Sequence, residues 1–261
     1  MNVHKLSTHL DSPVILDGAL ATYLETLGAD ISGALWSADI LLQNPSLIKQ
    51  THLDYYRAGA QVAITASYQA SLAGLNKHLN LSEEQGKDVI RKSVQLAQEA
   101  RDEWIEEHTK GLSTAEKSRA RYRLFVAGSV GPYGAYLADG SEYRGDYDVP
   151  KEDMKAFHRG RIQALVDAGV DVLACETIPS LGETEALVEL LRQEFNDSEA
   201  WFSFTLRDAH HISDGTPLTQ IAALFNDTPK VIALGFNCIP DDVALAALRA
   251  LSWARAAGAS G

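Results

Sequence analysis

The sequence has little cysteine, with Cys175 and Cys238 as the only two thiols among 261 residues. A small secreted protein stabilised by disulfides would use more, and both cysteines lie in apolar, strand-like contexts. We therefore predict free thiols and a reducing, cytoplasmic environment. The polar N-terminal segment, residues 1–11, lacks the continuous apolar stretch of a secretory signal peptide.

Long apolar runs and positive charge are also scarce. No uninterrupted apolar run is long enough to span a bilayer, although 46% of the residues are hydrophobic. The formal net charge is −12 and the isoelectric point is near 5.1, so phosphate backbones and anionic membrane surfaces would repel the chain. We expect small-molecule substrates, no nucleic acid partner and no membrane partner.

Three common functional motifs are absent. The first apolar segment ends in Asp17-Gly18-Ala19, without the G-x-G-x-x-G spacing of a dinucleotide-binding turn. In Gly128-Ser129-Val130-Gly131 the serine directly follows the first glycine, so this is not the G-x-S-x-G elbow of a serine hydrolase. Several histidines lack a metal-binding spacing, and we expect exposed or capping roles for them: His52, His78, His158, His210 and His211.

Short apolar segments alternate with longer segments of helical periodicity. Strands are predicted at residues 14–16, 62–65, 124–127, 170–174, 201–204 and 231–234. Helices are predicted at residues 45–59, 82–107, 151–168, 182–194, 219–225 and 241–251, and residues 110–121 form an exposed connection or a helix extension. Ser82 and Gln85 have the spacing of a capping box at a helix start. Apolar strands that are each separated by a helix indicate a parallel sheet covered on both faces.

Polar residues follow almost every predicted strand, namely Asp17, Thr65 to Tyr68, Ser129, Glu176, Thr205 and Asn237-Cys238. Functional groups at the carboxyl ends of successive parallel strands are typical of a (β/α)8 TIM barrel rather than an open doubly wound sheet. We predict an α/β fold of TIM-barrel type that forms one domain over residues 1–261. The barrel is predicted to be incomplete, because about six strand–helix units are present where a closed barrel has eight.

Two carboxylates, Asp17 and Glu176, directly follow predicted strands. They could hold a substrate ammonium group or act as acid and base. Alternatively, Asp17 caps the next helix and Glu176 pairs with an arginine. Because side chains alternate along a strand, Cys175 and Glu176 should point to opposite faces, with Cys175 packed in the sheet.

Cys238 directly follows Gly235-Phe236-Asn237 at the end of an apolar strand. Its thiol could be a nucleophile or a metal ligand, or it could be a buried structural cysteine. A separate loop is rich in tyrosines and carboxylates: Tyr133, Tyr136, Tyr143, Tyr147, Asp139, Glu142 and Asp146. Aromatic faces beside carboxylates suit a cationic ligand such as a sulfonium. The alternative is a long loop that uses its tyrosines as packing anchors.

These segments, in this order, resemble the homocysteine S-methyltransferase family. The matching stretches are residues 16–22, 35–37, 52–60, 64–70, 127–136, 143–147, 213–216, Cys175-Glu176-Thr177-Ile178-Pro179 and Gly235-Phe236-Asn237-Cys238. The resemblance is strongest to bacterial enzymes that use S-methylmethionine as methyl donor. It implies a zinc-dependent transfer of a methyl group from S-methylmethionine, or S-adenosylmethionine, to the thiol of L-homocysteine, forming methionine. In such enzymes zinc keeps the substrate thiol deprotonated at neutral pH.

The resemblance also implies roles for individual residues. Cys238 matches a zinc-binding, catalytic cysteine of the family. Asp17 and Glu176 match positions that bind the homocysteine amino group. Further substrate-binding positions are implied at Thr65, Ser67, Tyr68, Ser129 and Asn237, and donor-binding positions at Tyr133, Tyr136 and Tyr147.

The sequence departs from the family pattern in one respect. The family's other two zinc cysteines form a Gly-Gly-Cys-Cys motif, and this sequence contains no Cys-Cys pair. We therefore expect a chain that lacks the C-terminal zinc-cysteine segment, supplies one zinc ligand of three, and exposes barrel edges through which it could oligomerise. Two alternatives stay open: an impaired paralogue that binds an amino acid or a partner without turnover, or a metal-independent lyase or hydrolase that uses Asp17 and Glu176.

Overall fold

The computed structural model describes residues 4–31 and 36–258, which belong to two compact units, Met1–Ser129 with Gly160–Leu173 and Val130–Arg159 with Ala174–Gly261. The elements from the N-terminus to β2 are η1 (Leu6–His9), α1 (Leu20–Thr26), α2 (Trp36–Gln43), α3 (Pro45–Arg57), β1 (Val62–Ile64), α4 (Leu72–Leu79), α5 (Glu83–His108), α6 (Thr114–Arg121) and β2 (Phe125–Val130). They are followed by α7 (Tyr133–Leu137), η2 (Ser141–Tyr143), α8 (Lys151–Asp167), β3 (Val172–Ile178), α9 (Leu181–Gln193), β4 (Ala200–Phe204), β5 (Leu206–Asp208), β6 (His211–Ile212), α10 (Leu218–Leu224), β7 (Val231–Phe236) and α11 (Asp241–Gly258).

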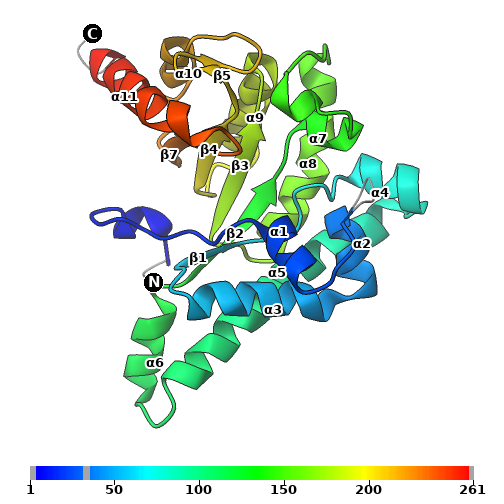
Figure 1. Ribbon diagram of the computed structural model, residues 1–261, viewed down its shortest axis with the longest axis vertical. Coiled ribbons are helices and arrows are strands. Elements are labelled where there is room, and N and C mark those ends of the chain that lie inside the picture. The colour runs from blue at the N-terminus through cyan, green and yellow to red at the C-terminus, as the bar shows by residue number, and fades with distance from the viewer. Residues whose placement is uncertain (1–3, 32–35, 259–261) are drawn as a thin grey trace. The chain divides into compact units, whose positions relative to one another are not determined.

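Strands and helices alternate along the chain as the sequence predicts (Figure 1). The main strands are hydrogen-bonded in the order β1-β2-β3-β4-β7, and the pairs β1–β2 and β4–β7 are parallel. The strand predicted at residues 14–16 is reduced to one parallel bridge from Leu16 to Val62. Ile15 and Leu16 are exposed there, so little packing extends the pairing further. With this bridge, the described residues hold the six strand positions that were predicted.

The long predicted helices form close to their expected bounds. At α5 the capping box is confirmed: Ser82 Oγ accepts a hydrogen bond from the Gln85 N–H at 3.3 Å, and Gln85 Oε1 accepts one from the Ser82 N–H at 2.9 Å. The segment predicted as a connection or extension is a separate helix, α6, which begins with a second capping box at Ser113 and Glu116. The short helices α1, α4 and α7 and the antiparallel β5–β6 pair were not predicted, because they are too short to show a clear periodicity.

In the first unit, α3 and α5 pack side by side and are tied to the strands by buried polar groups (Figure 1). Tyr56 on α3 is buried and donates a hydrogen bond from its hydroxyl to the Phe125 carbonyl at 2.8 Å. The buried Arg101 on α5 pairs with Asp171 at 3.1 Å, and Asp171 also accepts from the Val126 N–H at 2.7 Å. Since a buried ion pair is stabilising only when its remaining polar atoms are satisfied, these bonds fix the position of β2.

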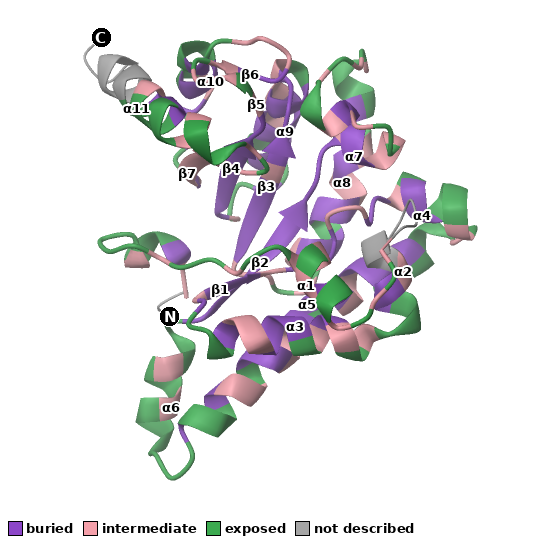
Figure 2. Cartoon of the chain, in the orientation of Figure 1, coloured by how far each residue is buried: buried purple, intermediate pink, exposed green. Residues whose placement is uncertain are grey.

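In the second unit, burial falls sharply between two neighbouring strands (Figure 2). All five residues of β4 are buried, whereas β7 is half-exposed from Ile232 to Phe236. Among the described residues, β4 is the only strand that pairs with β7. A strand with one partner leaves its other backbone edge unpaired. This agrees with the exposed edge expected at the sixth predicted strand.

Candidate functional site

The predicted site residues are distributed over both units. The first unit holds Asp17, Thr65, Ser67, Tyr68 and Ser129, and the second holds Tyr133, Tyr136, Tyr147, Glu176, Asn237 and Cys238. In each unit they lie near or after the carboxyl ends of strands, where parallel α/β folds place their functional groups; Ser129 and Glu176 are still inside β2 and β3.

The Asp17 carboxylate is anchored to the adjacent strand β1. Its Oδ2 accepts a hydrogen bond from the Ile64 N–H at 2.8 Å, and its own backbone N–H donates to the Val62 carbonyl at 2.9 Å. Helix α1 has Ala19 at its N-cap, so Asp17 does not occupy the capping position that was considered for it. The side chain is only 5% exposed, and a nearly buried carboxylate is a strong site for a positive group.

His52 lies beside Asp17, with Nδ1 3.9 Å from Oδ2, which is too long for a hydrogen bond. The ring is completely buried, and neither of its nitrogens has a hydrogen-bond partner in the structure. Burial lowers the pKa of His52 to about 4, so the ring is neutral at neutral pH. The expectation of an exposed or capping His52 is therefore wrong. Its spacing from the apolar Ile48 and Tyr56 on the same helix face was a signal of burial.

Three of the predicted substrate-binding residues, Thr65, Ser67 and Ser129, form a buried hydrogen-bond network at the ends of β1 and β2. Thr65 Oγ1 and Ser67 Oγ are 2.8 Å apart, and Ser67 Oγ donates to the Ser129 carbonyl at 2.8 Å. The Ser129 N–H in turn donates to Thr65 Oγ1 at 3.0 Å. The network joins the carboxyl ends of the two strands. Tyr68, which follows it, is half-buried, and its carbonyl accepts from Arg161 Nη1 at 3.1 Å.

In the second unit, two pairs of predicted or matched residues lie at strand ends. Glu176 and Thr177 are near the end of β3, and Asn237 and Cys238 directly follow β7. Cys175 is fully buried and Glu176 is half-buried, which confirms the predicted alternation of these side chains. Asn237 Oδ1 accepts from the Thr177 N–H at 2.9 Å, and Asn237 Nδ2 donates to Thr177 Oγ1 at 2.8 Å. Thr177 was not among the predicted site residues, although it lies within the matched Cys-Glu-Thr-Ile-Pro segment.

Cys238 is exposed, so the alternative of a buried structural cysteine is wrong. Thr177 Oγ1 donates to its sulfur at 4.0 Å and Asn237 Nδ2 donates to it at 3.5 Å. The pKa of the Cys238 thiol is raised, chiefly because the surrounding protein removes water from it. The carboxylates of Glu176 and Glu142 raise it further, whereas the two hydrogen bonds oppose the shift. Because the shift is upward from a value near 9, the thiol is protonated at neutral pH.

The predicted donor-binding tyrosines form one aromatic cluster with Phe157 of α8. The ring of Tyr133 lies 5.4 Å from that of Tyr136, 5.5 Å from that of Tyr147 and 4.9 Å from that of Phe157, measured between ring centroids. All three tyrosines are half-buried. Such tilted and edge-on pairs are favourable packing geometries. The loop is therefore anchored by its tyrosines, as the alternative proposed.

Two further residues that are in contact with this cluster were missed. Glu183 of α9 is fully buried, and its Oε1 lies 2.7 Å from His158 Nε2 and 2.7 Å from the Tyr133 backbone nitrogen. His158 is completely buried, so the expectation of an exposed or capping histidine is wrong here also. A signal was present in the sequence, because Glu183 shares a helix face with the apolar Leu187 and Leu191.

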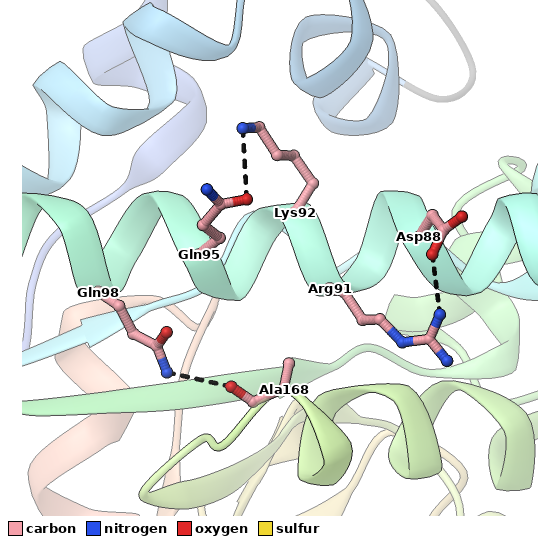
Figure 3. Close-up of a pocket in the computed structure, with 6 residues that line it drawn as sticks. All are labelled: Asp88, Arg91, Lys92, Gln95, Gln98 and Ala168. Carbon is pink, nitrogen blue, oxygen red and sulfur yellow. Dashed lines mark hydrogen bonds and ion pairs between the residues drawn. The ribbon is translucent and has the colours of Figure 1, made fainter.

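Two open hollows of the first unit are lined by residues other than the predicted site residues. One, of about 360 Å³, lies along α5 and is lined by Asp88, Arg91, Lys92, Gln95, Gln98 and Ala168 (Figure 3). Its polar groups bond to one another, as Gln98 Nε2 does to the Ala168 carbonyl at 3.1 Å. Another, of about 620 Å³, is lined by His9, Trp104, Arg119, Ala120, Tyr122, Arg123 and Leu124.

The residues present do not make a complete zinc site. Within residues 4–31 and 36–258, no three histidine, cysteine, aspartate or glutamate side chains come together as a set of metal ligands. Cys238 is an exposed thiol, but Cys175 is enclosed in the sheet. A protein zinc site uses three or four such ligands, so one thiol alone does not fit it. In the same part of the chain, none of the helices combines the length and the apolar character needed to cross a membrane.

Comparison with known proteins bears on the identity of the fold and the site. The family model described as Homocysteine S-methyltransferase matches residues 14–259. The chain is 54% identical over 238 residues to a homocysteine S-methyltransferase of Escherichia coli, covering 91% of this chain and 73% of that protein. It is 49% identical over 227 residues to the homocysteine S-methyltransferase YbgG of Bacillus subtilis, covering 87% and 69% of the two chains.

The structure is also similar to a solved one. The metallated form of the Escherichia coli homocysteine methyltransferase MmuM matches with a TM-score of 0.85 at 54% identity, covering 94% of this chain and 81% of that chain. This match confirms the predicted α/β fold of TIM-barrel type. The chain therefore belongs to the homocysteine S-methyltransferase family and is an enzyme of that type.

Proposed function

We propose that this chain transfers a methyl group from a sulfonium donor, S-methylmethionine or S-adenosylmethionine, to the thiol of L-homocysteine and so forms methionine. Relatives named homocysteine S-methyltransferase support methyl transfer to homocysteine. The observation that carries the proposal within the chain is the exposed thiol of Cys238, which lies two residues after the end of β7 in a segment matched to the family.

Each unit offers a carboxylate that is proposed as a binding group for the homocysteine ammonium, Asp17 in the first unit and Glu176 in the second. Asp17 is nearly buried and is held by the Ile64 N–H, so its charge has a defined position. Glu176 is half-buried, and its charge raises the pKa of the neighbouring Cys238 thiol. A carboxylate in such surroundings binds a cationic group more strongly than it would in water. Further substrate-binding residues are proposed in each unit: Thr65, Ser67, Tyr68 and Ser129 in the first, and Asn237 in the second.

The reaction is a displacement at carbon in which charge disappears. The homocysteine sulfur, after losing its proton, forms a bond to the methyl carbon while the bond from that carbon to the donor sulfur breaks. The bonding electrons stay on the donor sulfur, which becomes a neutral thioether. Because a cation and an anion react to give two neutral products, surroundings with little water favour the transfer. Tyr133, Tyr136 and Tyr147 supply such surroundings for a sulfonium.

Zinc enters this proposal at one residue only. Cys238 is the ligand that the described residues would offer, and the absence of a complete ligand set among them gives no basis for further zinc contacts. The thiols of the chain provide a test, because Cys175 is buried in the sheet and Cys238 is exposed.

The experiment measures methionine formation by the purified chain from homocysteine with each sulfonium donor, together with the zinc content of the protein. Cys238→Ser is compared with Cys175→Ala, the matched control. We expect Cys238→Ser to lose activity and Cys175→Ala to keep it, and we expect neither variant to retain zinc through purification, because one thiol is not a complete ligand set. Full activity of Cys238→Ser would instead support metal-independent chemistry at Asp17 and Glu176. Binding of homocysteine without methionine formation would support a binding protein.

A further inference from the structure

Glu183 is a carboxylate placed on the apolar face of a helix. It is the third residue of α9, and its side chain is completely buried. Leu187 and Leu191, which follow at intervals of one helical turn, are buried on the same face. A buried carboxylate is costly unless it is well hydrogen-bonded, so its partners explain its presence.

Glu183 gathers hydrogen bonds from three different segments. Its Oε1 accepts from the Tyr133 backbone N–H at 2.7 Å and from His158 Nε2 at 2.7 Å. Its Oε2 accepts from the Tyr147 hydroxyl. A carboxylate oxygen accepts from the backbone N–H, from the phenol and from His158 Nε2 in the tautomer that carries a proton there. Glu183 thereby fixes the start of α7, the tyrosine loop and α8 to one point.

Within residues 4–31 and 36–258, no lysine or arginine forms a hydrogen bond or an ion pair with Glu183. Its hydrogen bonds come from a backbone amide, a phenol and an imidazole. Burial, reinforced by Glu183, raises the pKa of Tyr147, so the phenol stays a neutral donor. A phenol that donates to a carboxylate carries extra electron density on its ring, and this strengthens attraction between the ring face and a cation.

The tyrosines that lie next to Glu183 are the predicted donor-binding residues. Tyr147 lies 5.5 Å from Tyr133, measured between ring centroids, and Tyr133 lies 5.4 Å from Tyr136. All three tyrosines are half-buried. A sulfonium and the thioether formed from it differ by one methyl group and one positive charge. A buried negative charge next to the rings therefore favours binding of the sulfonium over binding of the neutral thioether.

We propose that Glu183 is a specificity-determining positioning residue, whose buried charge and hydrogen bonds to Tyr133 and Tyr147 make the tyrosine cluster bind a sulfonium cation in preference to the neutral thioether. This inference rests on the proposed function, because it assigns the sulfonium donor to the tyrosine cluster. It adds a residue that does not line the cluster and acts through the tyrosines.

Two substitutions separate the charge of Glu183 from its hydrogen bonds. In Glu183→Gln the amide oxygen can accept from the Tyr133 N–H and His158, while the amide nitrogen donates to the Tyr147 oxygen. The three contacts are then kept, with the bond to Tyr147 reversed in direction, and the negative charge is lost. Glu183→Ala removes both and leaves three buried donors without an acceptor. Glu185→Gln is the matched control, because Glu185 is a half-exposed carboxylate on the same helix that pairs with Lys151 at 3.2 Å.

The test measures the dissociation constants of S-methylmethionine and methionine by calorimetry in the absence of homocysteine, with the melting temperature of each variant. We expect Glu183→Gln to weaken S-methylmethionine binding about tenfold, to change methionine binding less than about twofold, and to melt near the wild type. Glu183→Ala should weaken both ligands and lower the melting temperature. Glu185→Gln should leave both constants unchanged.

If the ratio of the two dissociation constants is unchanged in Glu183→Gln, the inference is overturned. A protonated His158 that cancels the charge of Glu183 would give this result. An equal loss for both ligands also overturns it, because it assigns Glu183 a purely structural role. Methyl transfer by the wild type is assayed separately. If methionine forms while the ratio is unchanged, the proposed function stands and the inference fails. If the wild type neither binds the sulfonium nor forms methionine, the proposed function fails as well.

Discussion

The side chain of Asn237 brackets Thr177 with two hydrogen bonds, accepting from its backbone N–H at 2.9 Å and donating to its hydroxyl at 2.8 Å. Thr177 has a φ of 62°, and the residue after Asn237, Cys238, has a φ of 52°. Positive φ is costly for a β-branched residue, and such strain persists only where surrounding contacts enforce it. The bracket is therefore the contact that holds the end of β3 in this conformation.

Asn237→Ala should lower the free energy of unfolding by about 2 kcal/mol, because it leaves the buried N–H of Thr177 without an acceptor. Urea unfolding followed by circular dichroism measures the change. Asn196→Ala, at an exposed position after α9, is the control and should change stability by less than about 0.5 kcal/mol. Equal effects of the two substitutions would contradict the role of the bracket.

The two thiols should differ in reactivity toward iodoacetamide. Cys238 is exposed and Cys175 is buried, so the native protein should be alkylated once and the denatured protein twice, as read by mass spectrometry. Although Cys238 is exposed, neighbouring protein atoms displace water from its thiol and raise its pKa above the usual value near 9, so its alkylation should be slow at pH 7 and accelerate as the pH rises past 9. A rate that is independent of pH over this range, or alkylation of native Cys175, would show that this assignment is wrong.

His52 should make stability depend on pH. Burial lowers its pKa in the folded protein to about 4 from an ordinary value of 6.5, so the unfolded chain binds more protons between these values. The neutral His52 ring contributes fully to the free energy of unfolding above pH 6.5. This contribution decreases as the pH falls toward 4, by up to about 3 kcal/mol. His52→Gln should remove this part of the pH dependence in urea unfolding at several pH values. The control, His78→Gln at an exposed position, should retain this pH dependence. The same slope of unfolding free energy against pH in both variants would argue against a buried neutral His52.

Gly134→Ala should be strongly destabilising. A Cβ atom at Gly134 would lie 2.4 Å from the backbone nitrogen of Glu142, which cannot move without shifting the tyrosine loop. We expect a loss of more than about 2 kcal/mol, measured by thermal unfolding. The control is Gly182→Ala on α9, where a Cβ would meet nothing within 4 Å and the substitution should stabilise by up to about 1 kcal/mol. Similar melting temperatures for both variants would rule out the close approach at Gly134.

The local pattern of the sequence predicted most of the architecture. The apolar runs at residues 124–127 and 201–204 became the buried strands β2 and β4, because a strand covered on both faces has no polar side to show. The capping residues Ser82 and Gln85 marked the start of α5 correctly, because a cap depends on neighbouring residues only. The alternation that buries Cys175 and turns Glu176 to the other face has the same local origin.

Periodicity and short motifs, read along the chain, were thus enough to determine the alternation of strands and helices, the family, and the strand ends where Asp17, Glu176 and Cys238 lie. Only the tertiary structure decided which polar groups meet. It buried His52 and His158, which the sequence placed at the surface, and it brought Tyr133, Tyr147 and His158 to Glu183 across 50, 36 and 25 residues of chain. The reason is that propensities and caps depend on near neighbours, whereas the partners of a buried polar group are chosen by packing between distant segments.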